Sequence, residues 1–264
     1  MRAAVYFLAL VMVAVLIAGC APPSGPGPEL DTDREAAMWQ SFRSGEMHAE
    51  SPQAFSLTCS LNYSGPDQQN RVVVHFWGNA DYPLRMDLQA GVGTIFTYWR
   101  EAEDGFIAYV PEEQAAYLHD DGKLGMAAFG FTFPFSLQEL AQFLLGRVHE
   151  LLPEEYNSAQ VLEDGTVEYT FIEQGKRFTV LLDAEGRPME LTSPDIPPWE
   201  MEIRTYLDDA GLEQVPERIR IVREPEEKIM LLVKSFAFKT ESWAPGSLDL
   251  ELPPGTELRR LLNQ

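Results

Sequence analysis

The sequence reads Phe55-Ser56-Leu57-Thr58-Cys59-Ser60-Leu61-Asn62-Tyr63 in the stretch that decides the fold. Apolar side chains occupy the odd positions of these nine residues, and small polar side chains stand between them. Because successive side chains of a β-strand point to opposite faces, this alternation predicts an antiparallel strand with one buried face. The same two-residue period returns along most of the chain, which indicates a mainly β protein.

Further strands are expected wherever the alternation recurs between turn signals such as Gly91-Val92-Gly93 and Glu224-Pro225-Glu226-Glu227. These predicted strands lie at 71–77, 84–88, 94–100, 106–110, 115–119, 167–171, 178–182, 189–191, 199–203, 218–223 and 228–238. We find no internal repeat and no second domain boundary. The prediction is therefore one curved antiparallel sheet of about eleven strands, and a sheet this long must curl or close.

About three helices should accompany the sheet in an α+β arrangement. A first helix is expected over 33–44. In the second, Ser136 and Glu139 form a capping box, and Leu137, Leu140, Ala141 and Leu144 share one face. This helix should end near Gly146, although its pattern could continue to Leu151. A last helical turn or two is expected over 256–262.

The N-terminus carries an apolar run, 3–18, behind the single basic residue Arg2. The run leads into Leu16-Ile17-Ala18-Gly19-Cys20, which resembles the lipobox of a bacterial lipoprotein. That resemblance implies a signal peptide over 1–19, a lipidated Cys20 with a flexible tether over 20–30, and a folded domain over 31–264. The alternative is an uncleaved membrane anchor. With Cys20 lipidated, Cys59 has no partner for an intramolecular disulfide.

The charge balance restricts the partners. The chain has 20 Lys and Arg against 41 Asp and Glu, a formal net charge of −21. A surface this acidic repels nucleic acid and anionic lipid head groups. We therefore expect no nucleic-acid partner, and we expect contact with a membrane to depend on the lipid at Cys20.

The predicted strands present more apolar surface than the helices can cover. A curved sheet with few covering helices can keep an apolar cavity for a hydrophobic ligand. The candidate cavity residues are Phe55, Leu57, Leu61, Tyr63, Leu84, Met86, Leu88, Leu140, Leu144, Tyr169, Phe171, Phe178 and Val180. The alternative is that the same side chains simply fill the interior as ordinary core.

The block from Pro83 to Gly146 resembles the LolA/LolB lipoprotein-sorting family, and LolB more closely. The resemblance lies in short motifs: Leu84-Arg85-Met86-Asp87-Leu88, Gly91-Val92-Gly93, Gly105-Phe106-Ile107-Ala108-Tyr109, Gln114-Ala115-Ala116-Tyr117, Phe133-Pro134-Phe135 and Phe143-Leu144-Leu145-Gly146. It implies an incomplete antiparallel barrel with a helical lid that holds lipoprotein acyl chains. It also implies a periplasmic LolA-like carrier as donor and a monomer anchored in the outer membrane.

The same resemblance assigns a membrane-insertion loop. In LolB a protruding loop between two early strands carries an exposed apolar residue, and the matching loop here is 89–93 with Val92 at its tip. The family residue is typically Leu, so the smaller Val puts transfer in question more than binding. Alternatively, Gly91 and Gly93 form a tight hairpin whose Val92 packs back on the sheet. Ala21 stands where lipoproteins retained in the inner membrane often carry Asp, which favours outer-membrane delivery.

No motif for catalysis, a metal or a cofactor is found in the sequence. The four histidines lack metal-ligand spacing and are expected at the surface or at strand edges. Arg85 is expected to be a surface charge, and Cys59 a buried small hydrophobe. We therefore expect a non-enzymatic lipoprotein that binds acyl chains and passes lipoproteins into the outer membrane. The alternative is a structural or assembly lipoprotein on the same scaffold that binds a protein partner.

Overall fold

The computed structural model describes residues 29–44, 53–66, 69–91, 93–131, 134–193, 198–209, 211–223, 227–244 and 246–261; for 29–32 it describes the helical backbone only. The predicted signal peptide, Cys20, most of the tether, Val92 and the turn residues Glu224 to Glu226 lie outside the described residues.

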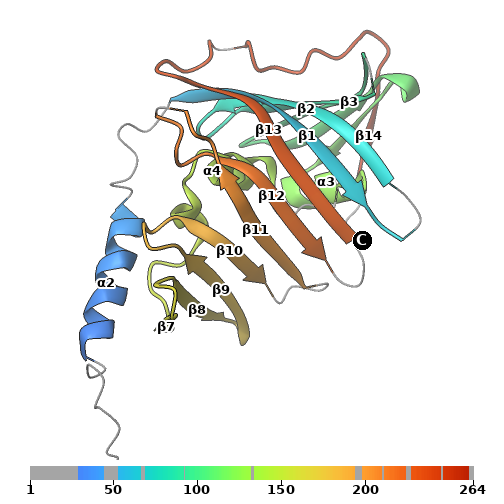
Figure 1. Cartoon of the computed structure of the whole chain (residues 1–264). Helices are drawn as coiled ribbons and strands as arrows, with labels where there is room; N and C mark the ends of the chain where they lie inside the picture. Colours follow the sequence, from blue (N-terminus) through green and yellow to red (C-terminus); the bar gives the residue numbers. More distant parts are fainter. Residues whose placement is uncertain are drawn as a thin grey trace, which may run out of the picture.

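One large curved sheet dominates the structure, with helices on its concave side (Figure 1). Its order is β14-β6-β5-β4-β3-β2-β1-β13-β12-β11-β10-β9-β8-β7. The strands are β1 (Ala54–Ser64), β2 (Gln69–Asn79), β3 (Leu84–Ala90), β4 (Thr94–Ala102), β5 (Gly105–Val110), β6 (Ala115–His119), β7 (Ser158–Val161), β8 (Val167–Glu173), β9 (Lys176–Leu182), β10 (Pro188–Ser193), β11 (Trp199–Tyr206), β12 (Pro216–Arg223), β13 (Glu227–Lys239) and β14 (Glu257–Arg260).

The order of strands shows two meanders that meet at the pairing of β1 with β13. Strands β1 to β6 follow one another toward one end of the sheet, where β14 adds the last strand, and β13 back to β7 run to the other end. The two ends do not pair with each other, so the sheet is an incomplete barrel. This confirms the predicted mainly β architecture with a curved antiparallel sheet.

The predicted count of about eleven strands is wrong, because the described residues form fourteen. Two four-residue strands at the ends of the sheet, β7 and β14, match none of the strand ranges predicted from the sequence. The helical turn expected over 256–262 is not formed by its described residues, 256–261; Glu257–Arg260 instead pair in parallel with β6 as β14. Strand β14 has no alternation of apolar residues, and β7 alternates over only four residues, Ala159 and Val161 packing against the core, which is too short to predict a strand.

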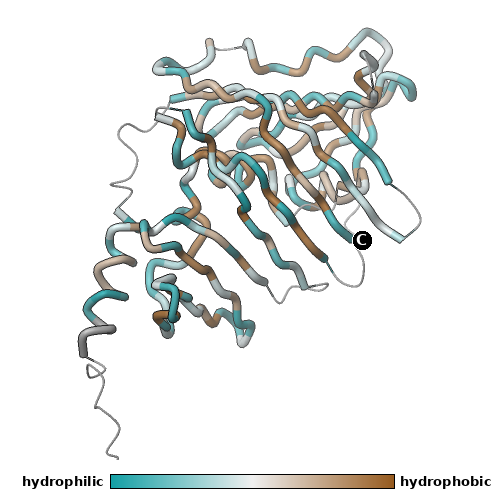
Figure 2. Tube along the Cα trace, viewed as in Figure 1, coloured by the Kyte–Doolittle hydropathy of each residue, from teal (hydrophilic) through white to brown (hydrophobic). Residues whose placement is uncertain are grey.

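The alternation of hydropathy along the strands is visible in Figure 2. Phe55, Leu57, Cys59 and Leu61 of β1 are all buried. Their neighbours in register, such as Val72 opposite Leu61 and Phe76 opposite Leu57, continue the same apolar rows across the sheet. The concave face is therefore apolar, as the first strand predicted.

The connection from β6 to β7 crosses beneath this face and supplies its cover. It contains α3 (Gly122–Ala128), α4 (Leu137–Leu144) and the 3-10 turn η2 (Val148–Leu151); a further 3-10 turn, η1 (Pro111–Glu113), precedes β6. The capping box is confirmed, because the Glu139 amide donates to Ser136 Oγ and the Ser136 amide donates to Glu139 Oε2. Helix α4 ends at Leu144, two residues before Gly146.

A buried carboxylate fixes the start of α4. Glu101 of β4 is 4% exposed and accepts hydrogen bonds from the amide of Leu137 at 2.6 Å and from the hydroxyl of Tyr82 at 3.3 Å. Burial raises the pKa of Glu101, while the amide donors oppose that rise. The carboxylate satisfies a helical N–H that would otherwise lack a partner.

The N-terminal helix α2 (Glu29–Ser44) covers the other end of the concave face. Its Trp39 is buried and packs against Phe42, Tyr156, Tyr169 and Phe171, with ring centroids 4.9–5.6 Å away. The Trp39 indole N–H donates to the carbonyl of Glu154 at 3.0 Å. This aromatic cluster fills the interior beneath β8.

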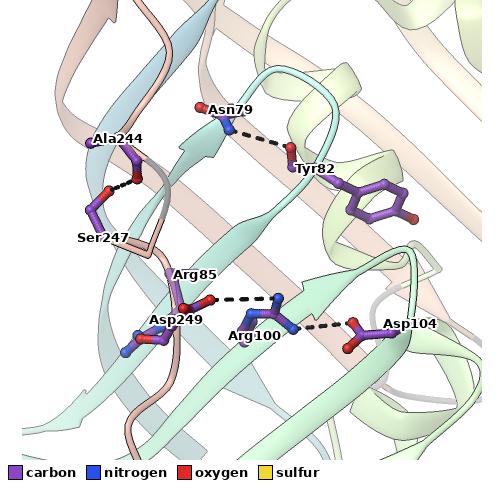
Figure 3. A network of polar contacts seen from close by, with 8 residues as sticks. All are labelled: Asn79, Tyr82, Arg85, Arg100, Asp104, Ala244, Ser247 and Asp249. Atoms are coloured by element: carbon purple, nitrogen blue, oxygen red, sulfur yellow. Dashed lines mark hydrogen bonds and ion pairs between the residues drawn. The ribbon is translucent and has the colours of Figure 1, made fainter.

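The convex face is partly covered by the chain between β13 and β14. The Trp243 amide donates to Asn79 Oδ1 at 2.8 Å, and Leu248 is buried. The Arg85 guanidinium donates to the carbonyl of Asp249 at 2.6 Å, and Figure 3 shows Asp249 beside Arg85 and Arg100. We call residues 240–256 the strap. The expectation that Arg85 is a surface charge is wrong: Arg85 is 8% exposed because the strap covers the outward face of β3.

Replacing Trp39 with Ala should lower the free energy of unfolding by about 3–5 kcal/mol, since the change removes a buried aromatic and leaves a cavity. Denaturant unfolding followed by circular dichroism measures it. Gln40→Ala is the matched control, because Gln40 is the exposed neighbour on the same helix. Equal stabilities of the two variants would show that the aromatic cluster does not support this end of the sheet.

Candidate functional site

A cavity of about 560 Å³ lies at one end of the concave face, where β1 ends and β2 begins. Pockets for small apolar ligands span roughly 300–1,000 Å³. Its walls come from the five neighbouring strands β1 to β5, from β13, from η1, and from the end of α3 and the loop after it. The lining residues are Leu61, Tyr63, Asn70, Arg71, Val72, Leu88, Ala90, Phe96, Thr97, Trp99, Val110, Glu113, Phe129, Gly130, Phe131 and Ile229.

The register of the strands explains why this wall is apolar. Leu61 pairs with Val72, and Val72 pairs with Ala90, so one transverse row of the sheet lines the cavity. Tyr63 pairs with Ile229 on the other side of β1. The side chains of all these residues lie on the concave face of the sheet, the face to which Phe55 also points.

Aromatic side chains close the opposite wall. The Trp99 ring lies 5.2 Å from Phe131 and 5.9 Å from Phe129, measured between centroids. The polar atoms beside it are satisfied, because the Trp99 indole donates to Thr97 Oγ1 at 2.9 Å and Thr97 Oγ1 donates to the carbonyl of Tyr109 at 3.1 Å. A wall whose polar groups are already paired suits an apolar ligand.

Polar residues stand at the rim. Asn70 and Arg71 are exposed at the start of β2, and the Tyr63 hydroxyl donates to Glu227 at 3.2 Å. Glu113 of η1 completes this set. The cavity therefore combines apolar walls with a polar edge, which is how an amphipathic ligand is held with its polar end toward water.

The hairpin between β3 and β4 adjoins the cavity. Ala90 and Phe96, on its two strands, line the cavity, and Phe96 is 39% exposed. Gly91 and Gly93 have φ values of 58° and 99°, a region that favours glycine, and a Cβ added at either would touch nothing within 4 Å. The two glycines therefore project beside the cavity; the side chain of Val92 lies outside the described residues.

The structure divides the predicted cavity residues between this cavity and the core. Leu61, Tyr63 and Leu88 line the cavity. Phe178 lines a second cavity of about 390 Å³, near Phe135 and Trp199. The others are buried in the core: Phe55, Leu57, Leu84, Met86, Leu140, Leu144, Tyr169, Phe171 and Val180.

Several residues that line the cavity are not among those predicted from the sequence. The side chains of Val72 and Ile229 lie on the concave face of their strands. The two-residue alternation of apolar side chains in the sequence could therefore have predicted both residues. Phe129 and Phe131 belong to the loop after α3, where no period exists, and only the tertiary structure brings them to Trp99.

The described part of the chain holds no group of three His, Cys, Asp or Glu side chains that could hold a metal ion. His119 is buried, so the expectation of a surface or strand-edge side chain needs correction: its Nδ1 accepts a hydrogen bond from the Asp121 amide at 2.8 Å, in the turn that begins α3. Among these described residues, no helix is both long and apolar enough to cross a membrane.

No protein-family model and no curated protein matches the sequence. Solved structures do match the fold. A LolA superfamily protein from Nitrosomonas europaea aligns with a TM-score of 0.54 and 9% identity over 82% of this chain and 97% of its own. A putative outer membrane lipoprotein-sorting protein domain from Vibrio parahaemolyticus gives 0.54 and 10%, over 80% and 95%. This chain has a LolA-type fold.

A third match extends the comparison. A DUF1329 family protein from Desulfovibrio piger aligns with a TM-score of 0.54 and 10% identity, over 81% of this chain and 99% of its own. At such low identities the likeness shows the fold alone. The LolA-type fold nevertheless agrees with the half-barrel that the resemblance in the sequence implied.

Cys59 offers a test of the packing beneath the sheet. Its thiol is 2% exposed, and burial raises its pKa to about 12. In a Cys20→Ser variant, which keeps this single thiol, an aromatic disulfide reagent at pH 8 should react with the native protein far more slowly than with the unfolded protein, because little thiolate forms and access is blocked. Equally fast labelling of both states would contradict the buried position.

Proposed function

We propose that this chain is a non-enzymatic, lipid-anchored carrier that binds acyl chains in the cavity at the β1–β4 end of the sheet and helps insert lipoproteins into the outer membrane. The observation that carries the proposal is the cavity itself, about 560 Å³ with apolar walls and a polar rim. The polar rim would hold the glyceryl and peptide parts of a lipoprotein at the water boundary.

The position of the β3–β4 hairpin supports the transfer step. Its glycines adjoin the cavity, and the exposed Phe96 stands at its base. With Val92 at the tip, the hairpin would enter the bilayer surface beside the opening and let the acyl chains leave the cavity without crossing water. Transfer along such a path avoids the cost of exposing apolar chains, about 0.8 kcal/mol for each CH₂.

The N-terminal features complete the proposal. Lipidated Cys20, followed by Ala21 and the Pro- and Gly-rich tether, would hold the domain at the periplasmic face of the outer membrane. The donor would be a periplasmic LolA-like carrier, with this chain acting as a monomer. The names of two structural neighbours, a LolA superfamily protein and a lipoprotein-sorting domain, support the same function.

The competing function is an assembly lipoprotein that binds a protein partner. The observation in its favour is that most of the predicted cavity residues pack into the core around Trp39 and α4. The two functions differ in what the remaining cavity holds.

Filling the cavity tests the proposal. Val72→Trp places a large ring on the concave face and should weaken binding of a fluorescent acyl probe at least tenfold, because the ring occupies the ligand volume. Val73→Trp is the matched control, since Val73 lies next on β2 with its side chain on the opposite, convex face. Native mass spectrometry of both variants reports co-purified lipid. If wild type and Val72→Trp bind the probe equally, or no acyl ligand binds wild type, the carrier function is wrong.

The transfer step needs its own assay. Val92→Glu should leave probe binding within twofold of wild type and abolish delivery of a lipoprotein to liposomes, because a charged tip resists entry into the bilayer. Cys20→Ser should bind the probe normally but lose membrane residence. Unchanged delivery by Val92→Glu would remove the hairpin from the mechanism.

A further inference from the structure

The C-terminal strand β14 lies at an outer edge of the sheet and is held there with little burial. Leu258 is 63% exposed, and Glu257 and Arg260 are exposed as well. The strand pairs in parallel with β6, and the amides of Glu257 and Leu261 donate to the carbonyls of Gln114 and Leu118 at 2.9 Å. Backbone hydrogen bonds to an edge can be formed equally by another extended chain.

Two consecutive arginines give this pairing its side-chain specificity. The Arg259 guanidinium lies over the Tyr117 ring, 5.5 Å from its centroid, and donates to the Tyr117 hydroxyl at 2.6 Å and to Glu113 Oε2 at 3.2 Å. The Arg260 guanidinium donates to Asp120 Oδ1 at 2.6 Å. The edge of β6 therefore presents one carboxylate at each end and an aromatic ring between them.

The contacts that fix the strap are separate from the contacts that hold β14. The strap before it is fixed by buried Leu248 and by the contact of Asp249 with Arg85. Pro253, Pro254 and Gly255 then separate these fixed residues from β14, and Gly255 has a φ of 87°. A hinge at this point frees β14 alone.

We propose that the edge of β6 is a docking site for an extended, arginine-containing segment of a partner protein, and that β14 occupies the site until such a segment displaces it. The bound β14 shows the chemistry that the site recognises: a parallel strand with two adjacent arginines. The net charge of −21 favours the approach of a basic partner. Because β14 is attached to the same chain, its effective concentration at the edge of β6 is high, and it competes strongly with a segment of a partner. The partner therefore docks only when its segment displaces β14.

The site lies beside the cavity. Glu113, which accepts from Arg259, also lines the cavity, and the Tyr117 ring packs on Phe129 of the cavity wall with centroids 5.4 Å apart. A partner docked on β6 would stand next to the bound ligand, where it could give or take an acyl chain. That last consequence rests on the proposed carrier function, whereas the docking does not.

The experiment uses the full chain with Cys20→Ser and a fluorescent peptide of residues Thr256–Leu261, with binding followed by anisotropy. Wild type should bind the peptide weakly, because β14 fills the edge. Arg259→Ala/Arg260→Ala should bind it at least tenfold more tightly, because the attached strand has lost its anchors. Leu258→Ala is the matched control and should bind as wild type does, since its side chain points to solvent.

Glu113→Gln/Asp120→Asn, added to the double arginine variant, should remove the gain. The proposal is overturned if the arginine variant binds no more tightly than wild type, or if a peptide with both arginines replaced by alanine binds equally well. Binding of the acyl probe, measured without peptide, tests the carrier function separately. Failure of either proposal can therefore be told from failure of the other.

Discussion

The pairing of β1 with β13 is the constraint on which the rest of the structure depends. These two strands are neighbours in the sheet although residues 65–226 separate them in the chain, and they join two meanders that would otherwise be separate sheets. The register shifts between Thr58 and Cys59, which leaves Lys234 without an opposite residue. A bulge of this kind increases the local twist of a sheet. Here it lies at the centre of the curved sheet, between its two halves.

Curvature creates more concave surface than the covering elements can fill. Helix α2 packs Trp39 against one part of that surface, and α4 packs Leu140, Phe143 and Leu144 against the middle. The loop after α3 reaches the remaining end only with Phe129 and Phe131, and the cavity stays open there. Stability and binding are thus assigned to different parts of one apolar face. The well-packed part supplies burial energy, and the incompletely covered part supplies space for a ligand.

The two ends of the sheet and its convex face are protected in different ways. Near β7, Arg34 of α2 donates to the carbonyl of Gly165 at 2.9 Å, which ties the helix to this end of the sheet. At the other end β14 covers β6, and the strap buries Arg85 on the convex face. The strap and β14 form one continuous segment, so the residues that seal the convex face also position the strand at the edge. An open half-barrel needs such protection because an exposed edge invites pairing with other chains.

The sequence by itself determined the strands whose burial is one-sided and the helix whose ends carry caps. The alternation from Phe55 to Tyr63 and the pair Ser136 and Glu139 are local signals, because side-chain period and capping depend on neighbours in the chain. Only the tertiary structure decided which apolar residues line a cavity. Leu61 and Phe55 lie in the same phase of one strand, yet one faces open space and the other packed core, and the difference comes from loops and helices far away in the sequence. Arg85 and β14 show the same limit: covering by the strap and pairing at an edge arise from long-range contacts, which leave no period in the sequence.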